Sequence, residues 1–487
     1  MSGSRVHHLL IALILLAGAG LRVLAFSPYT IHHPDEAIQY IEQAYRLSLG
    51  AGLVPWESRL GMRSWVVPLL LAGPMRLGEA MAPGSLLYIV LPRAAAASVA
   101  STSVVAAYVI GRRVSPAHGL VAMAVMALWY ESVYFSVHVV TESLSVAAFL
   151  CAAALLGSGA ARSRLVAGGA LLTFAAIFRI QYGPAVAAFA IVLFGTRRRD
   201  WAWLTLGGLA AGVAGAIVDL VMGEPPFRWA YNNVYQNVIA DKASSFGRYG
   251  AAAYPQMLWL HWQAALVPIL WLALRAARRH PALGAAAAVN LAVHLLIGHK
   301  EWRFILLSGQ IAILLAAIGS VDMADRLKAG WGKRARSRPV LLTGLMAAWG
   351  AVSLLLAFSG ASDPGWRRFE GGFRLAREAR QRHACGVALL GGSYWATGGQ
   401  SYLRDVPLYS LPARDEATSR GQIASTGHAY DAIIAPPDSP VAAAYRRLAC
   451  RGEMPDRLCL AMRPGGCPRD AGSDRQLMQR VMERSGR

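Results

Sequence analysis

Long apolar runs separated by short arginine clusters constrain the fold of this chain more than any other feature. The chain has 487 residues, of which 55% are hydrophobic and only 15% are charged. A single soluble core does not need so much apolar surface, so a soluble single-domain enzyme is excluded. Because about 20 apolar residues cross a bilayer as one helix, the pattern predicts a mainly α-helical, polytopic membrane protein.

The net charge of +21 does not indicate a nucleic-acid partner. The basic residues lie in clusters between apolar runs instead of on one amphipathic face, which is typical of topology signals and contacts with lipid headgroups. They are almost all arginine, and alanine is abundant, which suggests GC-rich coding and a bacterial source. We therefore expect a multi-pass protein of the bacterial cytoplasmic membrane.

About eleven membrane spans follow when each apolar run is ended at a basic cluster or polar corner. They cover residues 9–26, 86–111, 117–137, 142–160, 165–178, 183–195, 201–222, 257–274, 282–298, 304–320 and 339–358. The first is interpreted as a retained signal anchor, because no clear cleavage site follows it. With arginine clusters placed in the cytoplasm, the loops 27–85 and 223–256 and the C-terminal region face the periplasm or the cell exterior.

Three domains are expected on this basis: a membrane domain over 1–358, an extracytoplasmic α/β domain over 359–472 and a disordered basic tail over 473–487. Short apolar runs in the second domain alternate with polar segments and a candidate helix. The runs are Gly386–Leu390, Asp431–Ala435 and Leu458–Met462, and the candidate helix is Val441–Ala449. Four cysteines in this domain, Cys385, Cys450, Cys459 and Cys467, predict up to two disulfides in any of three pairings. Their spacing does not favour zinc.

Two adjacent carboxylates, Asp35 and Glu36, appear where the chain leaves the first span. Pro34 biases His33 towards an extended conformation, so a helix can begin at Asp35. One interpretation is that the acids only stabilise the N-terminus of that helix, and the other is that they perform chemistry. Amphipathic spacing of Ile38, Ile41, Ala44, Tyr45 and Ser48 further predicts interfacial helices in this first outer loop.

Two more polar clusters lie at outer ends of spans. In His299–Phe304, Lys300 and Arg303 are suited to binding a phosphate, although interfacial anchoring with a pair between Lys300 and Glu301 is the simpler interpretation of the sextet taken alone. The segment Tyr231–Asn237, which runs into Ser245–Gly250, combines amides and aromatic rings that suit a sugar, or it is an ordinary polar loop. We find no glycine-rich phosphate loop, nucleophile elbow or metal-ligand spacing.

Taken together, these motifs resemble those of one enzyme family. In order they are His33-Pro34-Asp35-Glu36, Pro55-Trp56-Glu57, Met62-Arg63-Ser64, Thr141-Glu142-Ser143, Asn233 with Asn237 and Phe246-Gly247, and His299-Lys300-Glu301-Trp302-Arg303-Phe304. The chain resembles glycosyltransferase family 22 of the GT-C superfamily, the α-mannosyltransferases that use dolichyl-phosphate mannose in N-glycan and GPI-anchor assembly, over residues 1 to about 320. It departs from the family at Arg179-Ile180-Gln181, where an Arg-Pro pair is usual, and beyond residue 359.

The resemblance implies a GT-C fold and inverting transfer of a sugar, expected to be mannose, from a polyprenyl-phosphate donor to a glycolipid or glycan acceptor. A lipid-linked donor also fits the topology, because nucleotide sugars are not normally available outside the cytoplasm. On this resemblance Asp35 is the base, and Glu36 orients it or exchanges roles with it. The donor phosphate is assigned to Lys300, Arg303, His299 and Arg63, and the sugar or acceptor to His33, Glu57, Asn233, Asn237 and Glu301.

Three questions stay open at this point. A divalent cation, Mg²⁺ or Mn²⁺, beside Asp35 and Glu36 is allowed but demanded by no motif. A flippase for lipid-linked saccharides is an alternative, for which ionisable residues near the middle of spans would be expected, and Glu131 and Asp219 are ambiguous in this respect. A related enzyme with another donor sugar, such as arabinose, or with a protein acceptor is a further alternative.

Overall fold

The computed structural model describes most of the chain as two compact units. The described ranges are residues 3–50, 52–157, 159–331, 337–360, 365–392, 394–411, 416–439, 444–454 and 456–467. The helical unit consists of residues 1–26, 64–66 and 96–364, and the loop–sheet unit consists of residues 27–63, 67–95 and 365–487. The predicted tail 473–487 lies outside the described residues. The first outer loop thus belongs with the C-terminal region, and not with the helices that follow it in sequence.

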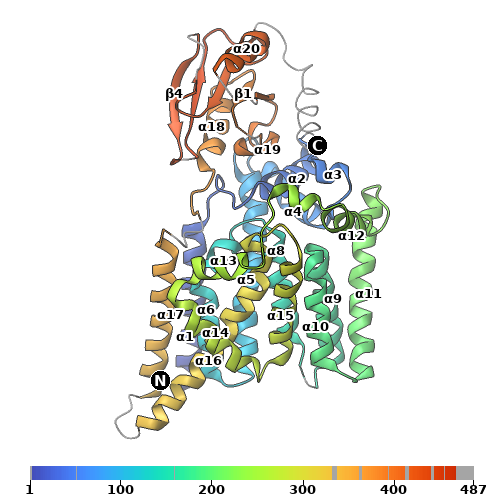
Figure 1. Ribbon diagram of the computed structural model, residues 1–487, viewed down its shortest axis with the longest axis vertical. Coiled ribbons are helices and arrows are strands. Elements are labelled where there is room, and N and C mark those ends of the chain that lie inside the picture. The colour runs from blue at the N-terminus through green and yellow to red at the C-terminus, as the bar shows by residue number, and fades with distance from the viewer. Residues whose placement is uncertain are drawn as a thin grey trace. The chain divides into compact units, whose positions relative to one another are not determined.

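The helical unit has a helix at each of the predicted spans (Figure 1). Its helices are α1 (Gly3–Ala25), α5 (Leu87–Arg112, which starts in the other unit), α6 (Pro116–Leu128), α7 (Tyr130–Ser136), α8 (Thr141–Leu155), α9 (Arg162–Phe178), α10 (Gly183–Phe194), α11 (Arg198–Val221), α12 (Arg228–Val234), α13 (Ala253–Trp262), α14 (Leu266–Ala277), α15 (Pro281–Leu296), α16 (Leu306–Trp331) and α17 (Arg338–Phe358).

Six of the described helical segments are long and apolar enough to cross a membrane, and a seventh is added if α6 and α7, bent by 59°, form one span. Helices such as α8 and α15 are apolar but short, so the number of eleven spans stays a prediction. The most buried span lies over α16, which packs against α6, α14 and α15. It is apolar on all sides, as expected of a helix surrounded by other helices.

Small residues let α9 and α11 pack closely. A Cβ atom added to Gly169 in α9 would collide with the carbonyl oxygen of Leu204, and one added to Gly207 in α11 would collide with that of Val166. Such contacts between backbones are typical of helices packed within membranes. Arg179 directly follows the last residue of α9, so its backbone is held by this closely packed pair of helices.

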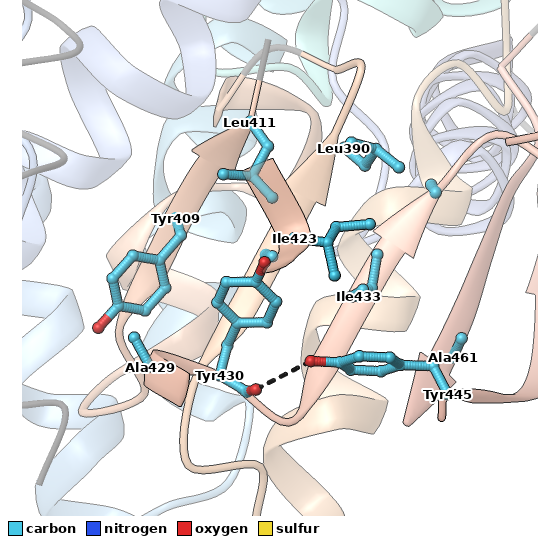
Figure 2. Packing of buried hydrophobic residues seen from close by; sticks show 11 residues of the cluster. Leu390, Tyr409, Leu411, Ile423, Ala429, Tyr430, Ile433, Tyr445 and Ala461 are labelled. Atoms are coloured by element: carbon cyan, nitrogen blue, oxygen red, sulfur yellow. Dashed lines mark hydrogen bonds between the residues drawn. The ribbon is translucent and has the colours of Figure 1, made fainter. Parts of the chain in front are cut away.

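The C-terminal part of the loop–sheet unit contains one five-stranded sheet in the order β2-β1-β3-β5-β4 (Figure 1). Its elements are α18 (Glu370–Gln381), β1 (Val387–Leu390), α19 (Gln400–Leu403), β2 (Leu408–Leu411), α20 (Glu416–Thr426), β3 (Ala432–Ala435), β4 (Arg446–Arg451) and β5 (Leu458–Met462). Strands β2, β1 and β3 are parallel, whereas β5 is antiparallel to both β3 and β4. The core of this sheet includes Tyr409, Tyr430 and Ile433, and the Tyr445 hydroxyl donates to the Tyr430 carbonyl at 3.2 Å (Figure 2).

Residues 446–449 were expected to be helical, and this prediction is wrong because they lie in β4. The strand is held in register with β5 by backbone pairing that places Cys450 opposite Cys459. These two cysteines form one disulfide, and Cys385 forms the other with Cys467. Any local preference for a helix at these residues was therefore overridden by pairing with a strand that follows later in the sequence.

The first outer loop folds into the π-helical turn η1 (Glu36–Ile41) and the helices α2 (Glu42–Leu49), α3 (Trp56–Arg59) and α4 (Val66–Met81). Residues 36–45 are all buried, so this segment is not a helix with one face exposed to the membrane surface. The interfacial prediction is wrong here because the polar side of α2 is covered by protein.

The polar side of α2 is satisfied by backbone donors from α19. The buried Glu42 carboxylate accepts the N–H groups of Gln400 and Ser401 at 3.0 and 2.8 Å, and that of Leu53 at 2.8 Å. Burial raises the pKa of Glu42 to about 7, although these three donors oppose the shift. The C-terminal region therefore fixes α2, the helix that follows η1.

Candidate active site

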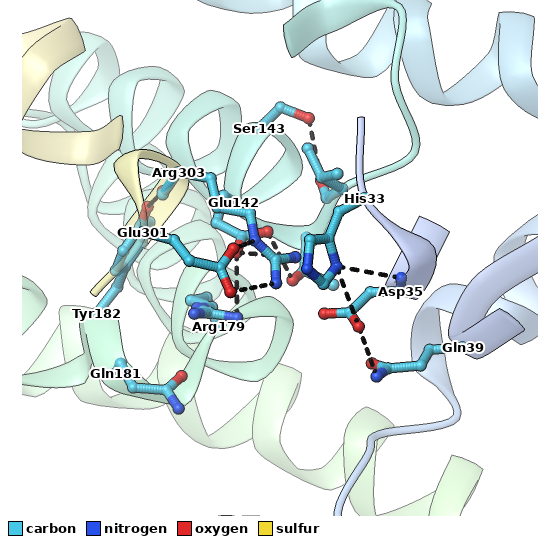
Figure 3. Close-up of polar contacts among 12 residues, drawn as sticks. His33, Asp35, Gln39, Glu142, Ser143, Arg179, Gln181, Tyr182, Glu301 and Arg303 are labelled. Atoms are coloured by element: carbon cyan, nitrogen blue, oxygen red, sulfur yellow. Dashed lines mark hydrogen bonds and ion pairs between the residues drawn. The ribbon is translucent and has the colours of Figure 1, made fainter. Parts of the chain in front are cut away.

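Asp35 lies immediately before η1, with its side chain 12% exposed. Gln39 donates to its Oδ1 at 2.9 Å, and His33 Nδ1 lies 3.2 Å from the same oxygen (Figure 3). Arg63 Nη2 is 3.8 Å from Oδ2. Gln39 reaches back because residues about one helical turn apart share a face, and π-helical turns occur frequently at functional sites. The arrangement orients the carboxylate and leaves part of it accessible.

Glu36, the adjacent carboxylate, has a different environment. It is fully buried, and its Oε1 lies 3.1 Å from Nη2 of Arg93, which is also buried. The N–H of His32 donates to its other oxygen at 3.0 Å, and Arg93 donates to the Thr30 carbonyl at 2.5 Å. Two buried charges thus compensate each other and hold the chain that leads to Asp35.

Glu57 is the third carboxylate of this cluster, and Gln39 Nε2 donates to it at 2.7 Å. The same amide therefore bridges Asp35 and Glu57. Burial raises the pKa of Glu57 to about 7, with Arg63 lowering it and the negative charge of Asp35 raising it. Near neutral pH this cluster holds one carboxyl group that gains or loses a proton easily.

A second cluster lies in the helical unit, where helix ends bring buried charges together. Glu142 in the first turn of α8 has its Oε1 3.1 Å from Arg179 Nη1 and 3.7 Å from Arg303 Nη1 (Figure 3). Arg303 Nε also donates to Glu301 at 2.6 Å. The guanidinium groups of Arg179 and Arg303 also lie 4.7 and 5.2 Å from the ring of Phe304. Both arginines are thereby fixed in position by acidic partners.

Within the sextet His299–Phe304, His299 contacts an acidic side chain, whereas Lys300 contacts backbone carbonyls. His299 Nε2 lies 2.9 Å from Glu301 Oε1, and this hydrogen bond raises the pKa of His299. Lys300 donates instead to the carbonyls of His294, Leu295 and Ile297, at 3.3, 2.9 and 2.6 Å. These carbonyls lie at the C-terminal end of α15, where a cation is favourable. In this conformation the three donors of Lys300 are all engaged with backbone, and burial lowers its pKa.

The two predicted asparagines have unequal surroundings. Asn233 is buried in α12 and accepts from Gln181 at 2.9 Å, so it lies at the corner that carries Arg179. Asn237 is half-buried in the following π-helical turn Tyr235–Ile239. The hydrogen bond to Gln181 therefore joins Asn233 to the corner that supplies the second cluster with Arg179, whereas Asn237 lies one turn further along the chain.

Several polar residues of the two clusters received no role from sequence reasoning: Gln39, Arg93, Glu142 and Arg179. Arg93 had a usable signal, because an ionisable residue within an apolar run is rare and generally has a partner. Glu142 and Arg179 belonged to recognised or altered motifs but were given no function. Gln39 had no signal beyond its spacing of four from Asp35.

The ambiguous acids Glu131 and Asp219 are hydrogen-bonded inside the helical unit. The indole N–H groups of Trp129 and Trp262 donate to Glu131 at 2.9 and 3.0 Å, and the Tyr130 hydroxyl donates at 3.2 Å. Asp219 accepts the N–H of Phe227 at 2.8 Å. Among the described residues, the one group with metal-ligand spacing is Cys385, Asp431 and Cys467, and its two sulfur atoms form a disulfide.

Comparison with known proteins agrees with this architecture. A model of the Alg9-like mannosyltransferase family matches residues 12–362. GPI mannosyltransferase 3 of Drosophila melanogaster is 39% identical over 85 residues, which are 17% of this chain and only 15% of that protein. Two crystal structures of ArnT from Cupriavidus metallidurans, one bound to undecaprenyl phosphate and one in the apo state, share the fold with a TM-score of 0.56 and 14% identity. The likeness covers 93% of this chain and 97% of ArnT.

These findings confirm the resemblance to glycosyltransferase family 22 and the GT-C type of fold. The family match includes both polar clusters and ends just beyond α17. The chain therefore belongs to the Alg9-like mannosyltransferase family.

Proposed function

We propose that this glycosyltransferase transfers a sugar, with mannose expected, from a polyprenyl-phosphate donor to a glycolipid or glycan acceptor, with inversion at the anomeric carbon. The family is one of mannosyltransferases, and the ArnT structure of similar fold was determined with undecaprenyl phosphate. The observation that carries the proposal is the contrast between two adjacent carboxylates. Asp35 is partly accessible and oriented by polar side chains, whereas Glu36 is buried and paired with Arg93.

Asp35 is the general base of the proposed mechanism. Its carboxylate takes the proton of the acceptor hydroxyl while the hydroxyl oxygen attacks C1 of the sugar. The bond between C1 and the phosphate oxygen breaks on the opposite face, and its electron pair leaves with the polyprenyl phosphate. Base assistance of this kind is typically worth about 10²- to 10⁴-fold in rate. Gln39 and His33 orient the base, and Glu36 is a positioning residue.

Arg303 is assigned to the departing phosphate, together with Arg179, which sequence reasoning did not include. Both are held by acidic partners before any ligand binds, and such preorganised charge is often the largest catalytic contribution. His299 and Arg63 remain additional candidates. We assign Lys300 to holding the end of α15, because its donors are engaged with backbone carbonyls. Glu57, Asn233, Asn237 and Glu301 remain candidates for sugar or acceptor contacts.

Location on the outer face of the bacterial cytoplasmic membrane is part of the proposal. Two disulfides in the loop–sheet unit support it, because disulfides persist in oxidising compartments. The arginine clusters between the helices support the same orientation. The flippase alternative is not retained, since the chain belongs to a glycosyltransferase family and Glu131 is fully engaged by aromatic donors.

The test is a transfer assay with the purified protein in lipid nanodiscs, radiolabelled polyprenyl-phosphate mannose and membrane-extracted acceptor lipids. We expect transfer by the wild type and a loss of at least about 10²-fold in Asp35→Asn. Asp200→Asn, the same exchange at the start of α11, is the matched control and should keep wild-type activity. Near-normal transfer by Asp35→Asn would refute the base assignment. In parallel assays with polyprenyl-phosphate arabinose or with a protein acceptor, transfer of arabinose but not mannose would refute the donor sugar, and labelling of protein but not lipid would refute the acceptor class.

A further inference from the structure

We infer that the cavity between α18 and the turn after β4 is a binding site for a phosphate group. Such a group is carried by an anionic lipid headgroup or is free in solution. The inference concerns the C-terminal region and does not depend on the proposed transfer reaction. The cavity has a volume of about 930 Å³, and all of its lining belongs to the loop–sheet unit. Five arginines contribute to this lining: Arg367, Arg374, Arg377, Arg382 and Arg451.

Acidic residues neutralise only part of this charge, because the five arginines share the lining with three acids, Glu370, Glu378 and Glu453. Arg374 donates to Glu370 at 2.6 Å, within α18. Glu378 serves two arginines, with Arg382 at 3.0 Å and Arg451 at 3.5 Å. One carboxylate shared by two guanidinium groups leaves donors and positive charge available for another anion.

Arg367 and Arg377 have no acidic partner among the residues that the structure describes. Arg377 is half-buried, and it also lines a second cavity of about 590 Å³ that contains Arg380 and His383. A guanidinium group that is partly removed from water gains more from an anionic partner than one fully exposed. The positive excess is therefore concentrated around Arg377.

The shape of the helix directs these arginines to one side. Phe373, Leu375 and Ala376 of α18 are buried against the sheet, whereas Arg374 and Arg377 lie one turn apart on the cavity side. Gly371 brings the helix close to the strand end, because a Cβ atom there would lie 2.5 Å from the Arg451 carbonyl oxygen. Arg451 is thus held beside the arginines of α18. Phosphate is the ligand chemistry that several converging guanidinium forks recognise best.

Binding is measured on the full-length protein in a neutral detergent, with two probes and their control. The probes are dioctanoyl-phosphatidylglycerol and inorganic pyrophosphate, and dioctanoyl-phosphatidylcholine is the neutral control. We expect the wild type to bind the anionic lipid in preference to the neutral one, and we expect affinity to fall as NaCl rises from about 50 to about 300 mM. Binding of pyrophosphate as well would identify the phosphate group alone as the ligand, and binding of the lipid only would identify the headgroup.

Variants locate the site. The double variant Arg367→Gln and Arg377→Gln should weaken binding of the anionic probe by about tenfold or more, since both positive charges without an acidic partner are then removed from the cavity. Arg446→Gln in β4, an exposed arginine outside the cavity lining, should bind like the wild type. The thermal unfolding midpoint of each variant shows whether it is folded. Equal binding by the wild type and a folded double variant, or no preference for either anionic probe, would overturn the inference, whatever the transfer assay gives.

Discussion

The two polar clusters differ in their balance of acidic residues and arginines. The cluster around Asp35 contains three carboxyl groups, those of Asp35, Glu36 and Glu57, beside two arginines, Arg63 and Arg93, and Gln39 bridges Asp35 and Glu57. The cluster around Glu142 holds two buried arginines by their acidic partners. An acid-rich cluster suits removal of a proton, and positioned guanidinium groups suit a departing phosphate. In the proposed mechanism, each cluster supplies a different part of the chemistry.

The largest expected effect comes from variants of Asp35 and Glu36 in which stability and transfer activity are measured separately. Glu36→Ala leaves Arg93 buried without its carboxylate, which should lower the free energy of unfolding by about 3–5 kcal/mol. Asp35→Asn should leave unfolding nearly unchanged while transfer is lost. Thermal unfolding in detergent, followed beside the transfer assay, distinguishes the two. Equal stability losses in both variants would mean that the acids do not differ in role.

The arginine cluster is tested by Arg303→Gln. Removing one preorganised donor to a developing negative charge costs about 10²- to 10³-fold in kcat, or about 2.7–4 kcal/mol. Lys300→Met should instead act mainly on stability, because the lysine holds the end of α15. Steady-state transfer rates, together with unfolding midpoints, separate these effects. A larger fall in kcat for a folded Lys300→Met than for Arg303→Gln would reverse our assignment of the phosphate contact.

Glu42 predicts how stability depends on pH. Its pKa is about 7 in the folded protein and about 4.5 in the unfolded chain, so its contribution is fully present below pH 4.5 and is lost as pH rises through 7. The unfolding midpoint should therefore be higher at pH 5 than at pH 8, and Glu42→Gln should reduce this difference by an amount corresponding to roughly 2–3 kcal/mol. An unchanged difference in the variant would show that other groups cause the pH dependence.

The smallest expected effect concerns Glu57. As pH rises through about 7, this group ionises beside Asp35 and adds negative charge, which increases the basicity of Asp35. Between pH 6 and 8 the wild type should show a rise in transfer, of less than about tenfold, that Glu57→Gln lacks. Profiles of kcat against pH for the two proteins provide the measurement. If the two profiles have the same shape, ionisation of Glu57 does not affect the transfer rate.

The positions of the helices could be predicted from the sequence because apolar runs report directly on burial in a membrane. The motifs around Asp35 and Lys300, taken together, likewise identified the family. The contact between α2 and α19 could not be predicted from the sequence. Glu42 and Ser401 are far apart in the chain, and the donor to Glu42 is the backbone N–H of Ser401, which no side-chain pattern reveals. The roles of Asp35 and Glu36 could not be separated for a similar reason, since the partner of Glu36 lies in a helix that begins much later.

The contact between Glu42 and the backbone of Gln400 joins residues separated by 358 positions. At about 5–20 residues per second, a ribosome needs on the order of 20 to 70 s to make the segment between them. During that time the loop that carries Asp35 lacks the part of the protein that covers it, although most helices of the unit that precedes α18 have already been made. A newly synthesised chain therefore acquires its helices first and its ordered acid cluster last, and premature termination after α17 would give a protein that contains the family region but cannot complete that loop.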